Sequence, residues 1–239
     1  MFTVLYPVWE ELYMGRIIIE NIDIFVEKKP IKNMYIRIIP PDGKVKITAP
    51  LFKTDEAVRL FAVSKINWIK RRRKRLAEKP RPAVYLYEDG ETHVLLGKQY
   101  PLKVMHGRIN TAFFRDGEII LQIRNNTTTA QRAKVINEWY REVLQKIIPS
   151  ILEKWEKSIG VRVTEWKIQN MKTKWGTCNI SERRIVFNLK LAKKPPECLE
   201  YVIIHELLHL LEKSHGAKFK KYMNAYCPDW RAVRKILNR

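Results

Sequence analysis

The sequence has few acidic residues and few cysteines. It contains 25 Asp and Glu against 46 Lys and Arg, which gives a formal net charge of +21, and only three cysteines in 239 residues. Cys178, Cys198 and Cys227 are odd in number and do not have the spacing of metal ligands. The sequence therefore predicts neither a disulfide framework nor a cysteine zinc site, and we expect three ordinary small, buried side chains in a reducing compartment.

Long apolar runs are also absent. No run reaches the about 18 apolar residues of a typical transmembrane helix. Glu10 and Glu11 follow a short apolar stretch, and the basic region, apolar core and cleavage site of a secretory signal are missing. A composition that is 46% hydrophobic and 10% aromatic is typical of a globular chain. We therefore expect a soluble cytoplasmic protein without a membrane partner, and the sequence leaves its oligomeric state open.

Positive charge is concentrated in one unbroken run, which consists of Lys70, Arg71, Arg72, Arg73, Lys74 and Arg75. Such a run attracts polyanions over long range and would bind nucleic acid in a strongly salt-dependent manner. The alternative is a solvated basic surface that only keeps the protein soluble. Nucleic acid or another polyanion is therefore a candidate partner of these six residues.

The segment His205-Glu206-Leu207-Leu208-His209 is an HExxH motif, and His215 follows six positions after it. Residues four apart on an α-helix lie on one face, so His205 and His209 can bind the same metal ion. Neutral imidazole is a good ligand for Zn²⁺, and a catalytic zinc site keeps three protein ligands and one open position. The chain has only five histidines, so a chance occurrence of this pattern is rare. The pattern predicts a site for one zinc ion.

Glu206 is the predicted catalytic base of this site. Its carboxylate can accept a proton from a water whose pKa the metal lowers toward ~7. This arrangement is typical of a metal-dependent hydrolase. The alternative is a buried helix whose histidines bond only to each other or to nearby carbonyl groups, and it would make the positions of Glu206 and the third histidine accidental.

The third ligand has two candidates, His215 and Glu212. We expect the helix to continue to Lys213 and the chain to turn at residues 214–216, with Gly216 in a left-handed conformation. Glu212 would then lie on the same helical face as His205 and His209, either as a ligand or in contact with one. We favour His215 as the ligand.

The distribution of apolar and turn-forming residues predicts an α+β fold. Thr54 can cap a helix whose inner face carries Val58, Phe61, Ile66 and Ile69 and whose exposed face carries the arginine run. Asp-Gly pairs are typical of tight hairpins and occur at 42–43, 89–90 and 116–117. We expect further strands at residues 84–87, 93–96, 100–104 and 119–123.

The polar segment 125–129 is the predicted domain boundary. Residues 1–127 are expected to form a β-rich region with the basic helix, and residues 128–239 a mainly helical domain with a small sheet. After the boundary, apolar residues recur every three or four positions up to Gly160, which predicts a long helix with a kink at Pro149. Strand-like segments at 165–169 and 184–189 precede the helix with the histidines.

Several segments around the histidines closely resemble the YgjP-like metallopeptidases, relatives of the SprT-like proteins. These are residues 171–178, 185–188 and 201–210, His215 with Phe219, and residues 227–230. The resemblance extends more weakly into the first half and covers most of residues 30–237. It is far more specific than HExxH alone.

The resemblance implies a zincin-type domain at residues 128–239, with zinc on His205, His209 and His215 and with Glu206 as the base. Lys174 stands where most members are expected to have arginine, and it brings positive charge without the bidentate geometry of a guanidinium group. Lys174 and Trp175 are candidates for contact with the substrate, whereas packing behind the helix is the alternative for Trp175.

Three functions are compatible with these residues. The favoured one is a zinc-dependent metallopeptidase, acting on protein or peptide substrates that include nucleic-acid-associated proteins by analogy with SprT-like relatives. The resemblance also implies a metal-dependent nucleoside triphosphate (UTP) pyrophosphatase, although the chain has no GxxxxGK[ST] phosphate loop. The third is a nucleic-acid-binding protein with a non-catalytic zinc site. Glu206 argues against it, because a structural zinc site does not need a base.

Overall fold

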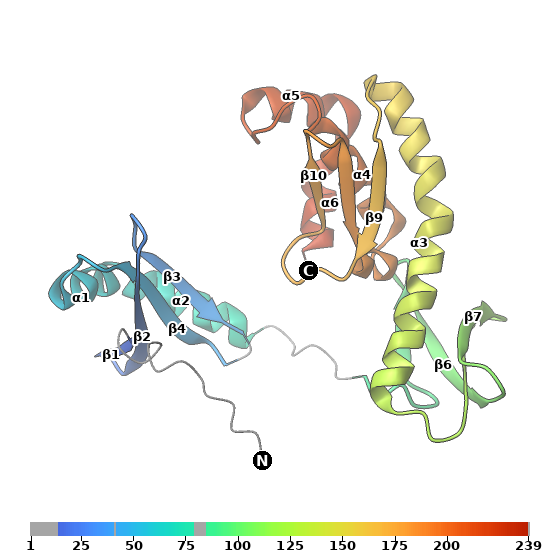
Figure 1. The fold of residues 1–239 in the computed structure, drawn as a ribbon, viewed down its shortest axis with the longest axis horizontal. Helices are drawn as coiled ribbons and strands as arrows, with labels where there is room; N and C mark the ends of the chain where they lie inside the picture. Colours follow the sequence, from blue (N-terminus) through green and yellow to red (C-terminus); the bar gives the residue numbers. More distant parts are fainter. Residues whose placement is uncertain (1–13, 41, 79–84, 239) are drawn as a thin grey trace, which may run out of the picture. The chain divides into compact units, whose positions relative to one another are not determined.

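The computed structural model describes residues 14–40, 42–78 and 85–238 (Figure 1). The chain forms two compact units, Met1–Val84 and Tyr85–Arg239, and each unit has its own hydrophobic core. The mixed α+β class predicted from the sequence is confirmed. Within the described ranges, no helix is long and apolar enough to cross a membrane.

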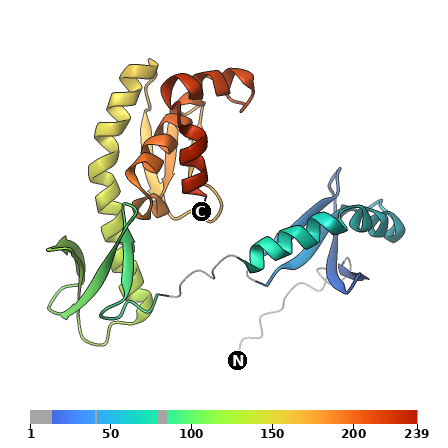
Figure 2. The same cartoon turned by 180° about the vertical axis from the view of Figure 1, so that it is seen from behind.

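The N-terminal unit is a four-stranded sheet packed against two helices (Figure 2). Its strands lie in the order β1 (Met14–Ile19), β2 (Ile22–Lys29), β4 (Lys44–Pro50) and β3 (Tyr35–Ile39). β2 and β4 are parallel, and the other neighbouring pairs are antiparallel. Residues on β2 and β4 alternate between buried and accessible, because one face of the sheet contacts the helices.

The two helices of this unit are α1 (Asp55–Ser64) and α2 (Ile66–Ala77). The Thr54 hydroxyl caps α1 as predicted and accepts a hydrogen bond from the Ala57 N–H at 3.2 Å. The single helix predicted here is wrong, because Lys65 leaves the helical conformation (φ −108°, ψ 2°) and divides it. Val58 of α1 and Ile69 of α2 are nevertheless buried in one core.

The C-terminal unit contains two sheets and four α-helices in the described ranges. The first sheet has the order β5 (Thr92–Leu95), β6 (Lys98–His106), β8 (Glu118–Ile123), β7 (Thr111–Arg115), and the second has the order β10 (Gly176–Asn179), β11 (Arg184–Asn188), β9 (Glu165–Gln169). The helices are α3 (Thr129–Ile159), α4 (Pro196–Leu208), α5 (Ala217–Tyr226) and α6 (Trp230–Leu237), and a short 3-10 helix, η2 (Leu189–Lys193), precedes α4.

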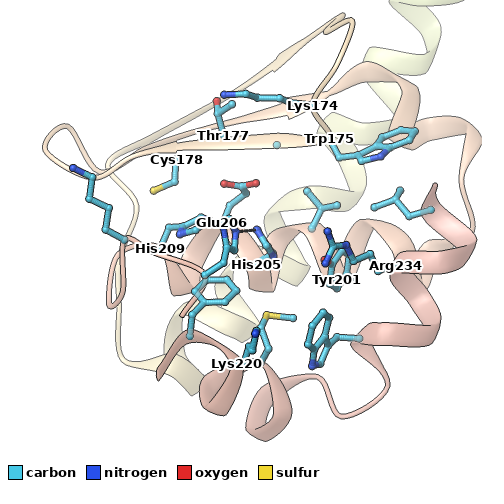
Figure 3. Close-up of a pocket in the computed structure, with 18 of the residues that line it drawn as sticks. Lys174, Trp175, Thr177, Cys178, Tyr201, His205, Glu206, His209, Lys220 and Arg234 are labelled. Carbon is cyan, nitrogen blue, oxygen red and sulfur yellow. Dashed lines mark hydrogen bonds between the residues drawn. The ribbon is translucent and has the colours of Figure 1, made fainter. Parts of the chain in front are cut away.

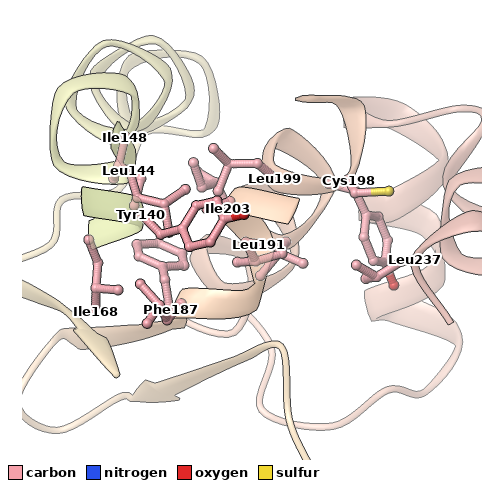
Figure 4. Close-up of a cluster of buried hydrophobic side chains, with 14 of the residues drawn as sticks. Tyr140, Leu144, Ile148, Ile168, Phe187, Leu191, Cys198, Leu199, Ile203 and Leu237 are labelled. Atoms are coloured by element: carbon pink, nitrogen blue, oxygen red, sulfur yellow. The ribbon is translucent and has the colours of Figure 1, made fainter. Parts of the chain in front are cut away.

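α3 is the long helix that the apolar periodicity predicted. Thr128 and Gln131 form a reciprocal capping box at its start, and Gly160 ends it in the left-handed region at φ 77°. Pro149 lies inside the helix. The buried face of α3 packs against β11, η2 and α4, with Leu144, Ile148, Phe187, Leu191 and Ile203 in one cluster (Figure 4).

The compact units divide between residues 84 and 85, whereas the polar segment 125–129 predicts a boundary between residues 127 and 128. The strands β5 to β8 pack on α3, so Leu102 and Leu121 belong to the same buried cluster as Leu144. In addition, the Tyr140 hydroxyl donates a hydrogen bond to the Val94 carbonyl at 2.7 Å. The polar segment 125–129 is therefore the cap of a helix within one unit.

Two of the three Asp-Gly pairs lie between paired strands as predicted. Asp116 and Gly117 turn the chain between β7 and β8 with positive φ values of 52° and 83°, and Gly43 lies between β3 and β4. The pair at 89–90 joins no two strands, and the β5–β6 hairpin turns instead at Leu96 and Gly97.

The strand predicted at 84–87 is wrong for residues 85–87, and Val84 lies outside the described residues. The Glu91 carboxylate accepts the N–H groups of Leu86 and Tyr87 at 2.8 and 2.9 Å. A side chain therefore takes the place of a neighbouring strand as the partner of these backbone groups.

A fragment of residues 85–239 is expected to fold cooperatively, whereas a fragment of residues 128–239 is not. The longer fragment keeps both partners of the shared core, and the shorter one exposes the apolar face that α3 presents to β8. Thermal denaturation followed by circular dichroism measures the difference. If the shorter fragment unfolded cooperatively with the same midpoint temperature as the longer one, the division at residue 85 would be contradicted.

Candidate metal centre

α4 carries the first two histidines. Pro196 and Glu197 begin the helix, and most of its residues are buried. His205 lies in its last turn and His209 is the residue that ends it. The helix therefore ends before Lys213, where the sequence predicted its end, and Gly216 is not left-handed but has φ −70°.

The early end of α4 brings the third histidine to the first two. The N–H groups of Leu210 and Leu211 bond to the carbonyls of Leu207 and Leu208, each at 3.0 Å, so the chain leaves the helix in a tighter turn. His215 follows just before α5, and its Nε2 lies 2.9 Å from the Nε2 of His205. One ligand atom from each of the three histidines lies within 4.8 Å of the others.

Phe219 of α5 holds the three imidazole rings in place. Its ring centroid lies 5.0 Å from that of His205, 4.9 Å from that of His209 and 4.8 Å from that of His215. The Phe219 side chain is buried. One apolar ring therefore packs against all three polar rings, which fixes their orientation from the side of α5.

The donor set fits one zinc ion. Nitrogens around a tetrahedral zinc lie about 3.3 Å apart for Zn–N bonds of about 2.05 Å. The Nε2 atoms of His205 and His215 lie 2.9 Å apart, and the three ligand nitrogens lie within 4.8 Å of one another. The Nδ1 of His209 lies 3.2 Å from the Glu212 carbonyl, which is the common outer partner of a metal-binding imidazole. Burial, more than the nearby positive groups, lowers the pKa of His205 to about 3, so its ring is neutral, as a metal ligand must be.

Glu206 is one of the few buried polar residues of the described chain. Burial raises the pKa of its carboxyl group to about 8, and the positive charge of Lys174 acts in the opposite direction. Figure 3 shows the carboxylate between the histidines and the strand that carries Thr177 and Cys178. A carboxylate beside three imidazoles is thus held away from bulk water.

Strand β10 passes directly over this carboxylate. A Cβ atom placed on Gly176 would lie 2.6 Å from Oε1 of Glu206 and 2.7 Å from its Cγ. Such contacts are shorter than side chains tolerate, so only glycine permits this approach. The backbone of β10 at Gly176 therefore lies directly against the side chain of the predicted base.

Asn188 holds the segment that leads into β10. Its side chain is buried, and its Nδ2 donates to the carbonyls of Met171 and Lys174 at 2.9 and 2.5 Å. Its own N–H donates to the Trp175 carbonyl at 2.9 Å. These bonds fix the backbone of residues 171–175. They therefore also fix the position of Gly176, the next residue in the chain.

The histidines and Glu206 open into a cavity of about 690 Å³. Glu206 is the only acidic residue among those that line it, whereas four cationic side chains do so, from Lys174, Lys213, Lys220 and Arg234. All four are exposed, and within the described residues none of them forms an ion pair with a carboxylate. The cavity therefore has a positive rim around a site for a cation and a base.

The structure brings most of the predicted site residues together. His205, Glu206, His209, His215, Lys174 and Trp175 all line the cavity. Trp175 is partly buried against the core, and its Nε1 donates to Asn238 at 3.2 Å. The Glu212 carboxylate accepts the N–H and the hydroxyl of Ser214 at 3.1 and 3.0 Å and is not part of the histidine cluster. Lys70 to Arg75 belong to the N-terminal unit.

The three cysteines are free, but only Cys198 is buried as expected, whereas Cys178 and Cys227 are half-buried. Cys178 lines the cavity, but burial and the charge of Glu206 raise the pKa of its thiol to about 11. It is therefore a neutral thiol at ordinary pH, which is a poor metal ligand.

Sequence reasoning missed Tyr201 and Arg234, which also line the cavity. Tyr201 lies four positions before His205, so helical spacing alone could have placed it on the same face. Arg234 comes from α6, which packs on α4, and its charge contributes to the lowered pKa of His205. Nothing in the spacing of Arg234 marks it, because its proximity arises only from tertiary packing.

Comparison with known proteins gives matches of two kinds. The family model of the YgjP-like metallopeptidase domain matches residues 32–239. Among solved structures, the metallopeptidase zymogen jannalysin of Methanocaldococcus jannaschii matches with 24% identity and a TM-score of 0.35 over 38% of this chain and 94% of that one. The zymogen abylysin of Pyrococcus abyssi matches with 21% identity and a TM-score of 0.33 over 36% and 85%. No curated protein matches.

Replacing Gly176 by alanine is expected to destabilise the C-terminal unit, because the new methyl group must displace either β10 or Glu206. Such overpacking costs about 1–3 kcal/mol in free energy of unfolding, which urea denaturation measures. Gly216→Ala is the control in the same unit, since the nearest atom to its added methyl group, the Ser214 Oγ, lies 3.5 Å away. Equal stability of the two variants would show that β10 does not rest on Glu206.

His215→Ala is expected to lower the affinity for Zn²⁺ on the order of 100-fold, since four ligands together contribute about 10–16 kcal/mol and each about 3 kcal/mol. Glu212→Gln should leave the affinity unchanged, because its carboxylate bonds to Ser214. Isothermal titration calorimetry measures both. The reverse pattern would make Glu212 the third ligand.

Proposed function

The chain belongs to the YgjP-like metallopeptidase family, and we propose that it hydrolyses peptide bonds at one zinc ion held by His205, His209 and His215. The observation that carries this proposal is the convergence of three imidazoles beside one buried carboxylate. When bound, a zinc ion polarises the carbonyl to be attacked and lowers the pKa of a water.

Glu206 acts as the general base and then as the general acid. It follows His205 in the chain, and its carboxylate lies in the cavity beside the histidines (Figure 3). It accepts the proton of the attacking water and passes that proton to the leaving amine. Lys174 favours the ionised form by its charge, which offsets part of the cost of burying a carboxylate.

Strand β10 supports a peptide as the substrate. It is an edge strand of its sheet and lines the cavity. An extended peptide can add to such an edge through main-chain hydrogen bonds, which give affinity without requiring a particular sequence. Because Gly176 at the start of β10 lies against Glu206, a peptide paired there has its backbone close to the base.

The positive rim supports acidic substrates. Four cations and one buried carboxylate surround the site, and such a field attracts negatively charged partners and disfavours basic ones. Peptides with acidic side chains near the scissile bond are therefore the proposed substrate class. Nucleic-acid-associated proteins are a narrower proposal, which the arginine run of α2 supports.

The same four cations support a second candidate, the hydrolysis of a nucleoside triphosphate such as UTP to UMP and pyrophosphate. Triphosphates usually enter protein sites with Mg²⁺ held by one or two carboxylates, and Glu206 is the only acidic residue in the described part of the chain that lines the cavity. The edge of β10 has no role in such a reaction. The peptidase is therefore the better supported activity.

Glu206→Gln is expected to bind zinc like the parent protein and to lose hydrolysis of an unfolded protein such as casein. The amide keeps the shape of the side chain but cannot accept the proton, and general bases typically contribute a factor of about 10²–10⁴. Peptide products are measured by mass spectrometry, and bound zinc by calorimetry.

Glu197→Gln is the matched control, because Glu197 is exposed at the start of the same helix, away from the cavity. It should cleave casein like the parent protein. The same proteins are incubated with UTP. Pyrophosphate release that Glu206→Gln abolishes, without cleavage of casein, would replace the peptidase by the second candidate. No turnover of either substrate would leave a non-catalytic zinc site.

A further inference from the structure

The arginine run of α2 is divided among different faces of the helix. Ile66 and Ile69 are buried, and Arg73 lies against Gly43, where its Nε comes within 3.5 Å of the Cβ position. Lys70 forms an ion pair with Glu20. The remaining side chains Trp68, Arg71, Arg72 and Arg75 have the spacing i, i+3, i+4, i+7 and therefore share one face.

This face borders a groove of about 580 Å³. Its second wall is β3, an edge strand of the N-terminal sheet, with Arg37, Ile38, Ile39 and the following Pro40. Two apolar side chains in the groove are open to solvent, since Trp68 and Ile39 each keep 43% of their accessible surface. The groove lies entirely within the N-terminal unit.

The groove combines positive charge with an exposed aromatic ring. Among the residues that the structure describes, four arginines and no acidic residue line it. Within the described residues, none of Arg37, Arg71, Arg72 and Arg75 forms an ion pair with a carboxylate. Each guanidinium group is thus open to an external anion. The groove therefore presents anion-binding groups and an exposed indole ring side by side.

We propose that the groove between α2 and β3 binds single-stranded nucleic acid. Arginines bind phosphate groups in bidentate geometry, and an exposed indole ring stacks on an unpaired base. A duplex hides the faces of its bases, so it would contact the arginines and leave Trp68 and Ile39 without partners. An anionic membrane or an acidic protein would likewise use the charges and leave the indole without a stacking partner.

The proposal is independent of the peptidase function, because it concerns residues of the N-terminal unit only. Its test uses the full chain without added metal, so that hydrolysis does not interfere. Fluorescence anisotropy with labelled oligo-dT, oligo-rU and a duplex of the same length gives the three affinities. Both single strands are expected to bind more tightly than the duplex at equal salt, and the ratio of the two tells DNA from RNA as the preferred strand.

Variants separate stacking from charge. Trp68→Ala is expected to weaken single-strand binding about 5- to 160-fold, as loss of one stacked base does, and Trp68→Phe should restore part of it. Arg71→Gln combined with Arg75→Gln should weaken binding and reduce the slope of log affinity against log salt by about 1.4, that is 0.7 per phosphate contact. Circular dichroism checks that each variant is folded.

Arg59→Gln combined with Lys74→Gln is the matched control. It removes the same charge from exposed positions of α1 and α2 that do not line the groove, and it should bind close to the parent protein. Equal loss in this control and in the groove variant, or binding unaffected by Trp68→Ala, would overturn the proposal in favour of general electrostatic attraction. Tighter binding to the duplex or to anionic vesicles would overturn it as well.

Discussion

The burial of the carboxylate of Glu206 is the physical constraint on which the site depends. A charged group away from water is costly unless neighbouring groups compensate it, and the described structure supplies two kinds of compensation. Lys174 contributes a positive charge from one side, and the three histidines offer a place for a cation on the other. Without these partners the buried acid would be a defect in the most apolar helix of the unit.

The same constraint explains the segments that surround α4. The helix can be buried on nearly all sides only because α3, β10 and α6 each pack on it. Glycine at 176 lets β10 approach to the distance of direct contact, and Asn188 fixes the chain that leads into that strand. Residues far from the histidines in the sequence therefore decide how closely the base is enclosed.

The local features of the chain could be predicted from the sequence because they rest on spacing. The positions of His205 and His209, the cap at Thr54 and the length of α3 follow from helical periodicity and from the preferences of capping residues. In the same way, β9, β11 and the turn at 116–117 are marked by patterns of residues that are close together in the sequence. These elements are present where the patterns placed them.

The features that the sequence did not predict depend on contacts between distant segments. The unit boundary lies at residue 85 because β8 and α3 share a core, and no composition change marks that contact. The sequence of residues 85–87 is typical of a strand, but the backbone N–H groups of Leu86 and Tyr87 donate to the Glu91 carboxylate instead of to a neighbouring strand. β1 and β2 also went unpredicted. The end of α4 at Leu208 was missed because the turn that follows it is stabilised by the packing of His215 and Phe219.

Charge shows this distinction most clearly. The cations of the cavity come from four separate segments, at 174, 213, 220 and 234, so only the tertiary structure makes them neighbours. The arginines of α2 are adjacent in sequence, yet their helical geometry places Arg73 against Gly43 and Arg72 in the groove. A run of charges in the sequence therefore identifies a basic helix. Which of its arginines can bind the same ligand depends on the face of the helix on which each side chain lies. The contribution of each arginine depends on its face and not on its place in the run.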